Sequence, residues 1–214
     1  MIKLVLIDFD DTLCLTEKAC FKMENEAAVS LGFPPMSKET HLKSWGLPLR
    51  ESAANRIPGI DPGEFIQRLE MLMPSYIERG ELDTVSEENL NALKELRKRG
   101  KKIAILTARE GSEVKHLIED THPVSAQLDG FFHKNSFEFY KPDPRVFDPI
   151  LEKFGVARDE VVYIGDTFND AVCSEKAGVK FIAVLESGLR TREDFKGYKV
   201  DFFADKFTDI MEYI

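Results

Sequence analysis

The stretch VLIDFDDTLC, residues 5–14, places an apolar run directly before three carboxylates that fall within four positions. The run predicts a buried strand, yet Asp is disfavoured in strands and is almost never fully buried without a partner. Two carboxylates about 4 Å apart repel by about 4 kcal/mol at an effective dielectric constant of about 20. Either a cation or bound protons compensate Asp8, Asp10 and Asp11, or the strand ends in a solvated acidic turn.

Four further segments have the same apolar character and predict strands: residues 103–106, 161–164, 179–188 and 198–207. Continuous apolar runs without alternation are typical of strands that are covered on both faces, as in a parallel sheet.

Helical patterns lie between these segments. Ser86 is a good N-cap, and Gly100 follows a run of basic residues that suits the carboxyl end of a helix. Residues 144–155, 169–178 and 206–214 also read as helices, with Pro149 as a possible kink. The alternation predicts an α/β fold with a doubly wound, mainly parallel, Rossmann-like sheet.

Residues 16–83 interrupt this alternation, because they contain helical patterns and no convincing strand. We therefore expect an inserted α-helical domain over 16–83 and a core domain built from residues 1–15 and 84–214. The insert leaves the core at the carboxyl end of the first strand.

Composition narrows the classes of partner. The chain has 214 residues and a net charge of −9, which argues against nucleic acid or an anionic membrane as the main partner. The three cysteines have no CxxC spacing, and no stretch resembles a signal peptide or a membrane span. These features predict a soluble, cytoplasmic protein, as a monomer or homodimer.

Chemically active side chains follow the predicted strands. In open parallel sheets, ligands bind beyond the carboxyl ends of the strands. The residues expected to meet at this edge are Asp8, Asp10, Thr12, Thr107, Lys141, Asp166 and Asp170. A carboxylate cluster without nitrogen or sulphur ligands suits a hard cation, Mg²⁺ above all.

The same set supports phosphoryl transfer. Asp8 could attack phosphorus and form an aspartyl phosphate. Thr107 and Lys141 could hold the phosphoryl oxygens, whose charge must be stabilised. Asp10 could serve first as an acid and then as a base.

Four motifs, in order, resemble those of the haloacid dehalogenase-like (HAD) superfamily. They are DFDDT at residues 8–12, Thr107 in LTARE, Lys141 followed by Pro142, and GDTFND at residues 165–170. The resemblance covers nearly the whole chain, and the insert lies where C1-type helical caps lie in that family.

The resemblance implies a role for each matching residue. Asp8 would be the nucleophile and Asp10 the general acid/base. Phosphate would be bound by Thr107, Ala108 and Lys141. Mg²⁺ would be held by Asp8, Asp10, Asp166 and Asp170. Asp11 replaces a Gly that many members carry, and we interpret it as a turn residue.

Asp10 also separates branches of the family. The dehalogenases and phosphonatases lack an Asp there, whereas cleavage of a phosphate ester requires protonation of the departing alkoxide. The resemblance is greatest to the phosphoglycolate phosphatase and β-phosphoglucomutase branch. The usual mutase histidine is absent after the first motif, which favours a phosphatase that acts on a small phosphorylated metabolite; a phosphosugar mutase is the alternative.

The insert offers Lys43, Trp45 and Arg50 as groups that could select the leaving group. Trp45 could equally pack between helices, and the two cations could be solvated. Arg109 could contact an anionic substrate or form a local salt bridge.

Two rival classes remain. A phosphoacceptor signalling domain also combines acids, a Thr/Ser and a Lys, but such domains are shorter and lack the insert. A catalytically silent scaffold would not be expected to keep Asp8, Asp10, Lys141 and Asp166 together, because clustered acids cost stability.

Overall fold

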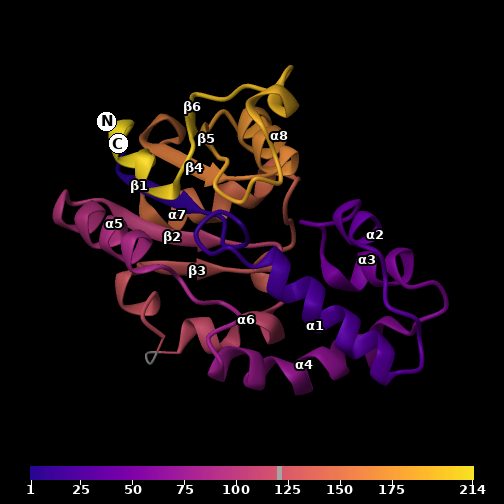
Figure 1. Cartoon of the computed structure of the whole chain (residues 1–214). Coiled ribbons are helices and arrows are strands. Elements are labelled where there is room, and N and C mark those ends of the chain that lie inside the picture. The colour runs from indigo at the N-terminus through magenta and orange to yellow at the C-terminus, as the bar shows by residue number, and fades with distance from the viewer. Residues whose placement is uncertain (120–121) are drawn as a thin grey trace. The chain divides into compact units, whose positions relative to one another are not determined.

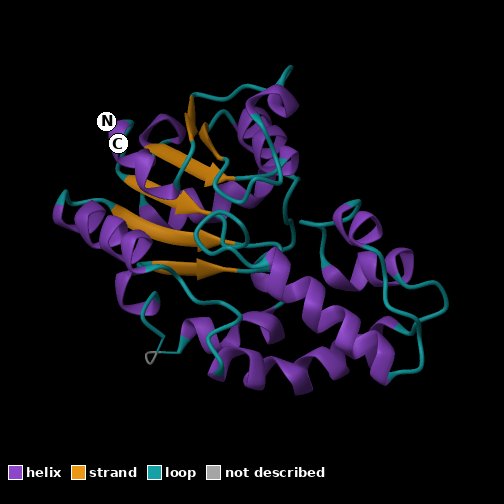
Figure 2. Ribbon diagram, in the orientation of Figure 1, coloured by secondary structure: helices purple, strands orange, loops and turns teal. Residues whose placement is uncertain are grey.

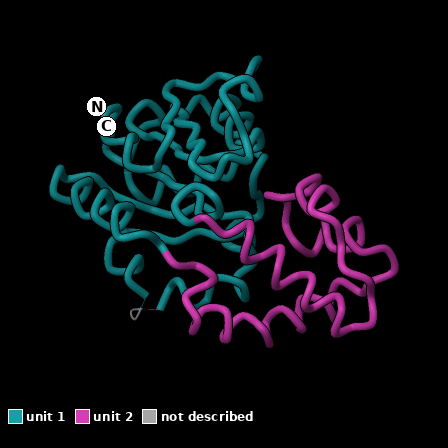
Figure 3. The backbone as a smooth tube through the Cα atoms, viewed as in Figure 1, with its two compact units in different colours: residues 1–14, 85–214 teal, residues 15–84 magenta. Residues whose placement is uncertain are grey.

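The computed structural model describes residues 1–119 and 122–214, and this part of the chain forms two compact units (Figure 3). Residues 1–14 and 85–214 make up one unit, which we call the core unit. Residues 15–84 make up the other, which we call the helical unit.

The core unit is built on a six-stranded parallel sheet in the order β3-β2-β1-β4-β5-β6 (Figures 1 and 2). The strands are β1 (Leu4–Ile7), β2 (Lys102–Leu106), β3 (Gly130–Phe132), β4 (Val161–Gly165), β5 (Lys180–Val184) and β6 (Phe202–Ala204). The strand order reverses between β1 and β4, and ligands bind at such switch points in open parallel sheets. The predicted doubly wound parallel sheet is confirmed.

Both faces of the sheet are covered. Val5 and Ile7 point into one apolar layer, which α5 (Glu87–Lys98) and α6 (Gly111–Ile118) complete. Leu4 and Leu6 point into the opposite layer, which is completed by α7 (Phe147–Phe154) and α8 (Phe168–Ala177). Because successive side chains of a strand alternate between faces, a strand covered on both sides carries an uninterrupted apolar run.

Local signals explain where these helices begin and end. The Ser86 side chain accepts the Asn89 N–H at 3.2 Å and caps α5. Gly178 ends α8 with φ of 69°, in the left-handed region that Gly adopts without steric cost. Pro149 lies in the first turn of α7, where its missing N–H removes no helical hydrogen bond, so no kink results.

The helical unit contains α1 (Glu17–Ser30), α2 (Lys38–Leu42), α3 (Leu49–Arg56) and α4 (Pro62–Glu78). Its apolar core includes Met23, Phe65 and Tyr76. Beside this core, the Arg56 guanidinium donates to both carboxylate oxygens of buried Glu24, at 2.8 and 2.7 Å. Apolar packing and a buried ion pair thus both connect its helices.

One strand was missed by the sequence analysis, and one predicted helix was wrong. Strand β3, at the edge of the sheet, was not expected, because GFF is only three residues long and begins with a Gly. Residues 206–214 were expected to form an α-helix, whereas Phe207–Glu212 form 3₁₀ turns. No helix within residues 1–119 and 122–214 is both long and apolar enough to cross a membrane.

Candidate active site

Asp8 lies directly beyond β1, at the switch point of the sheet. Its backbone N–H donates to the Ile164 carbonyl at 2.8 Å, so the chain stays paired with β4 up to this residue. One carboxylate oxygen accepts the Phe9 N–H at 2.8 Å, and the other lies 2.9 Å from Lys141 Nζ. The strand therefore delivers a buried carboxylate in a fixed orientation.

A tight turn follows Asp8. Asp11 adopts φ of 52°, in the left-handed region, where Asp is tolerated better than most residues. Its N–H donates to the Cys14 carbonyl at 2.7 Å, in agreement with the turn role expected for it. The next residue, Thr12, points its hydroxyl at Asp166 and donates to Oδ1 at 3.1 Å. The turn thus connects the end of β1 to the end of β4.

The segment after β4 supplies the second and third carboxylates. Asp166 follows Gly165, and Asp170 lies in the first turn of α8. Asp170 accepts the Thr167 N–H at 3.0 Å, and the Thr167 hydroxyl accepts the Asp170 N–H at 3.2 Å. A Cβ on residue 165 would lie 2.7 Å from Cγ of Asp170, so only Gly fits there. The reciprocal hydrogen bonds between Thr167 and Asp170 form a capping box, which fixes the Asp170 carboxylate.

Lys141 connects the carboxylates. Its ammonium lies 2.9 Å from both Asp8 Oδ2 and Asp170 Oδ1, and it donates to the Tyr163 hydroxyl at 2.8 Å. Tyr163 in turn donates to Asp170 at 2.8 Å. Burial lowers the pKa of Lys141, but the Asp170 and Asp8 carboxylates outweigh it and raise the pKa above its usual value. Lys141 therefore remains charged.

The single positive charge of Lys141 does not balance the negative charge of this cluster. One carboxylate oxygen each from Asp8, Asp166 and Asp170 lies within 4.8 Å of the others. The pKa of Asp8 is raised to about 7, because burial, the largest cause, together with Asp170 and Asp10 outweighs the lowering by Lys141. Burial, then Asp8 and Asp170, raise the pKa of Asp166 well above its usual range. Three carboxylates beside one ammonium lack two positive charges, and an all-oxygen set of this kind fits Mg²⁺.

Thr107 and Ala108 lie at the carboxyl end of β2, next to β1. The Thr107 N–H donates to the Phe132 carbonyl at 3.0 Å, and its hydroxyl accepts the Arg109 N–H at 3.2 Å. These two hydrogen bonds therefore fix the backbone and the hydroxyl of Thr107, the residue at which the second motif was predicted.

Asp10 forms an ion pair with Arg109. The Arg109 guanidinium donates to Oδ2 of Asp10 at 2.9 Å through Nε and to Oδ1 at 2.5 Å through a terminal nitrogen. Of the two possibilities for Arg109, the structure contains the salt bridge.

The three residues proposed to select the substrate lie in the helical unit. Lys43 is exposed and pairs with Glu39 at 2.9 Å. Trp45 is partly buried, with its ring 4.9 Å from that of His41. Arg50 is exposed on α3. These three residues do not form a buried cluster comparable to that of the core unit.

Sequence reasoning missed the roles of Tyr163 and Thr167. A Tyr in the middle of the fully buried strand VVYIG was a usable signal, because a buried hydroxyl requires a hydrogen-bonding partner. Thr167 belongs to a sequence typical of a capping box, with Asp170 three positions later.

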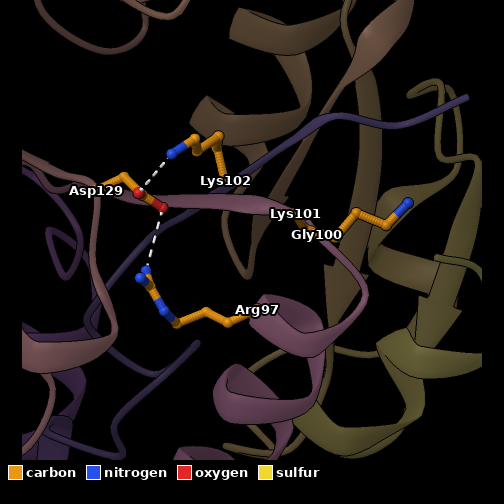
Figure 4. Close-up of a pocket in the computed structure, with 5 residues that line it drawn as sticks. All are labelled: Arg97, Gly100, Lys101, Lys102 and Asp129. Atoms are coloured by element: carbon orange, nitrogen blue, oxygen red, sulfur yellow. Dashed lines mark hydrogen bonds and ion pairs between the residues drawn. The ribbon is translucent and has the colours of Figure 1, made fainter.

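A cavity of about 150 Å³ lies away from this cluster, where α5 connects to the amino end of β2 (Figure 4). Arg97, Lys101 and Lys102 line it, but Asp129 already pairs with Arg97 at 3.3 Å and Lys102 at 3.1 Å. Lys101 donates to the Ile2 carbonyl at 2.9 Å, so each of the three cations already has a polar partner within the protein, and the cavity is not part of the candidate active site.

Known proteins resemble this chain along most of its length. It is 26% identical to a phosphoglycolate phosphatase of Pseudomonas savastanoi pv. phaseolicola, over 85% of this chain and 69% of that protein. It is 23% identical to the pyrophosphatase PpaX of Bacillus velezensis, over 97% of this chain and 94% of that protein.

The fold has solved counterparts as well. The crystal structure of CbbY from Rhodobacter sphaeroides in complex with phosphate matches with a TM-score of 0.82 at 20% identity, over 98% of this chain and 96% of that one. Residues 5–184, which include most of β1, all of β4 and every residue of the carboxylate cluster, match the model of one family, described as haloacid dehalogenase-like hydrolase. The chain therefore belongs to the haloacid dehalogenase-like hydrolases.

Proposed function

We propose that the chain is a Mg²⁺-dependent phosphomonoester hydrolase that acts on a small phosphorylated metabolite through an aspartyl-phosphate intermediate. The observation that carries this proposal is the cluster of Asp8, Asp166 and Asp170 around Lys141, at the switch point of the sheet. The similarity to phosphoglycolate phosphatases supports a phosphatase of that kind.

Asp8 is the proposed nucleophile. Its carboxylate is buried and oriented by the Phe9 N–H, and Lys141 lies beside its second oxygen. Attack of that second oxygen on phosphorus would break the ester bond and transfer the phosphoryl group to Asp8. Water would then hydrolyse the aspartyl phosphate and return the carboxylate.

Lys141, Thr107 and Ala108 are the proposed phosphate-binding residues. The Lys141 ammonium, held by Asp170 and Tyr163, supplies a fixed positive charge next to the nucleophile. Positioned charge of this kind is the main catalytic requirement of phosphoryl transfer, because negative charge spreads over the phosphoryl oxygens.

Asp10 is the proposed general acid/base. It lies two residues beyond Asp8, in the turn that follows β1. It would protonate the departing alkoxide in the first step and accept a proton from the attacking water in the second.

Mg²⁺ would be held by Asp8 and Asp166, with contributions from Asp170 and from Asp10. When bound, it would neutralise charge on the phosphoryl oxygens and orient the group for attack. Asp170 contributes less directly, since its oxygens already accept hydrogen bonds from Thr167 and Tyr163.

We further propose that residues 16–83 act as a cap domain that selects the leaving group, with Lys43, Trp45 and Arg50 as the selecting residues. The three cysteines are free thiols, which supports a cytoplasmic location. We propose a monomer or homodimer.

Hydrolysis of p-nitrophenyl phosphate with and without Mg²⁺ tests the proposal. Turnover should require the metal and disappear in excess EDTA. Acid quenching during turnover should yield a phosphorylated peptide that contains Asp8. Comparable activity in EDTA would refute the metal assignment, and a phosphorylated peptide elsewhere would refute the nucleophile.

A screen of phosphorylated metabolites, ranked by kcat/KM, identifies the substrate class. It should include phosphoglycolate, sugar phosphates, nucleoside monophosphates and pyrophosphate, the last because of the PpaX relative. β-Glucose 1-phosphate serves as the test for mutase activity, which we expect to be absent.

A further inference from the structure

Arg109 and Asp10 form a two-point ion pair in the core unit. Two guanidinium nitrogens donate to the two carboxylate oxygens, at 2.9 and 2.5 Å. The guanidinium also lies over the Phe9 ring, 5.3 Å from its centroid. Parallel, charge-assisted hydrogen bonds fix both the distance and the plane of a carboxylate. Arg109 therefore sets the orientation of Asp10 in the free protein.

This ion pair involves Asp10, the residue to which we assign proton transfer. A protonated Asp10 carries its hydrogen on one of the two oxygens at which an Arg109 N–H now points. Donation of that hydrogen to a leaving group also requires the oxygen to come within hydrogen-bond distance of the substrate. Each carboxyl oxygen has two lone pairs, so the Arg109 bonds do not block a proton on Asp10, but they fix the plane of the side chain; release of Arg109 frees Asp10 to turn toward the leaving group.

The surroundings of Arg109 allow such an exchange. The side chains of Arg109 and Asp10 are 10% and 21% exposed, whereas those of the Arg56–Glu24 pair are 2% and 5% exposed. An incoming anion can thus reach Arg109. The Arg109 backbone N–H donates to the Thr107 hydroxyl at 3.2 Å, so the residue directly adjoins the proposed phosphate-binding segment.

We propose that Arg109 is a specificity-determining residue that restrains Asp10 in the free enzyme and is transferred to a second anionic group of the substrate. The transfer releases Asp10 for proton transfer. This inference rests on the proposed function. It narrows the substrate class to phosphomonoesters whose leaving group carries a carboxylate or a second phosphoryl group. Neutral esters leave Arg109 on Asp10 and turn over slowly.

Three two-carbon esters that differ in one group test the preference of the wild-type enzyme. They are 2-phosphoglycolate, ethylene glycol bisphosphate and 2-hydroxyethyl phosphate, which carry a carboxylate, a second phosphoryl group and a neutral hydroxyl. We expect kcat/KM with Mg²⁺ to be about 10- to 100-fold higher for at least one anionic ester, as charged hydrogen bonds suggest. Because Asp10 is released, kcat should rise as well as KM fall. The two anionic esters show which group Arg109 accepts.

Variants test whether Arg109 causes this preference. Arg109→Gln should remove it, and Arg109→Lys should keep part of it, since Lys retains the charge and loses the planar fork. Arg158→Gln removes an exposed Arg–Asp pair with Asp148, 2.7 Å long, and serves as the matched control that keeps the full preference. If Arg109→Gln lowers kcat/KM of all three esters by the same factor, Arg109 is not specificity-determining.

A measurement on the wild-type protein does not depend on whether the variants fold. The ¹⁵N NMR signal of Arg109 Nε should shift when phosphonoacetate is added with Mg²⁺, and should not shift with methylphosphonate, which lacks a second anion. Equal responses to the two ligands would overturn the inference. Absence of Mg²⁺-dependent hydrolysis of p-nitrophenyl phosphate would overturn the proposed function itself. If that activity is present, equal kcat/KM for the three esters, or hydrolysis of none of them, would overturn this inference alone.

Discussion

Each unit of the molecule contains a cluster of charged side chains that is buried, apart from the exposed Lys38 of the helical unit, and the two clusters differ in their balance of charge. The core cluster consists of Asp8, Lys141, Asp166 and Asp170, with three carboxylates beside one ammonium. The helical-unit cluster consists of Glu17, Glu24, Lys38, His41 and Arg56, with two carboxylates beside two permanent cations.

The ion-pair geometry of the two clusters explains the consequence of this difference in charge balance. In the helical-unit cluster, Arg56 binds both oxygens of Glu24, and the His41 ring lies between Glu24 and Glu17 at 3.2 and 3.1 Å. The carboxylates of this cluster thus have their charged partners within the protein. In the core cluster, the pKa values of Asp8 and Asp166 are raised, with burial as the largest cause. A buried cluster that lacks two positive charges indicates a site for a ligand, whereas a balanced one indicates a structural role.

The largest expected effect is that of Asp8→Asn, which tests the functional side of the comparison. Removing the proposed nucleophile should lower kcat by about 10⁴-fold or more. Because the change removes one uncompensated carboxylate, the melting temperature at pH 8 without metal should not fall. Kinetics and thermal unfolding of the same preparation check both points; a variant that retains most of its rate would exclude Asp8 as the nucleophile.

The counterpart in the other cluster is Glu24→Gln, also a carboxylate-to-amide change. It leaves the Arg56 charge buried without its carboxylate, so the free energy of unfolding should fall by about 3 kcal/mol. The kcat of the folded fraction for p-nitrophenyl phosphate should stay within about threefold of wild type. Urea unfolding and kinetics measure these quantities, and unchanged stability would contradict the structural role of this cluster.

The dependence of folding stability on pH and on Mg²⁺ should be an effect of intermediate size. The pKa of Asp8 is raised in the folded state to about 7, so folding favours its protonated form. Without metal, the stabilisation from this group is complete below the unfolded pKa near 3.8 and is lost as the pH rises through about 7. The loss should be on the order of a few kcal/mol, since each unit of pKa difference between the folded and unfolded states corresponds to about 1.4 kcal/mol.

Mg²⁺ should reverse that loss, because it binds the ionised carboxylates. The increase in melting temperature on addition of Mg²⁺ should therefore be large at pH 8 and small at pH 5. Glu24→Gln should show the same pH pattern. An increase of equal size at both pH values would contradict the charge deficit in the core cluster.

The smallest expected effect is that of Tyr163→Phe, which removes the hydroxyl between Lys141 and Asp170. Loss of these hydrogen bonds should cost about 1 kcal/mol of stability and lower kcat by about threefold to tenfold. Tyr213→Phe, near the end of the core unit, is the control and should be close to neutral. If the two substitutions have equal effects, Tyr163 does not position the cluster.

The sequence was sufficient to predict the sheet and the carboxylate cluster, because both follow from short local patterns. Apolar runs identified β1, β2, β4, β5 and β6, and the rule that ligands bind beyond parallel strands brought Asp8 and Asp166 together. Strand β3 was missed because a three-residue strand carries too little pattern.

The pairing of side chains could not be predicted from the same patterns. Arg109 could have pointed at a ligand or at a neighbour, and only the folded arrangement shows both of its nitrogens on Asp10. Likewise, Tyr163 is one apolar residue among several in its strand until Lys141 and Asp170 are seen at its hydroxyl. Such contacts depend on side-chain conformations and on residues that lie far apart in the sequence.

Titration of the protein with Mn²⁺, as a spectroscopic substitute for Mg²⁺, tests the central claim most directly. Electron paramagnetic resonance of free Mn²⁺ would be measured for the wild type, for Asp166→Asn in the core cluster and for Glu24→Gln in the helical-unit cluster. The account predicts one ion bound per chain in the wild type and in Glu24→Gln, with binding lost or weakened at least about tenfold in Asp166→Asn. Equal binding by Asp166→Asn and the wild type would contradict it.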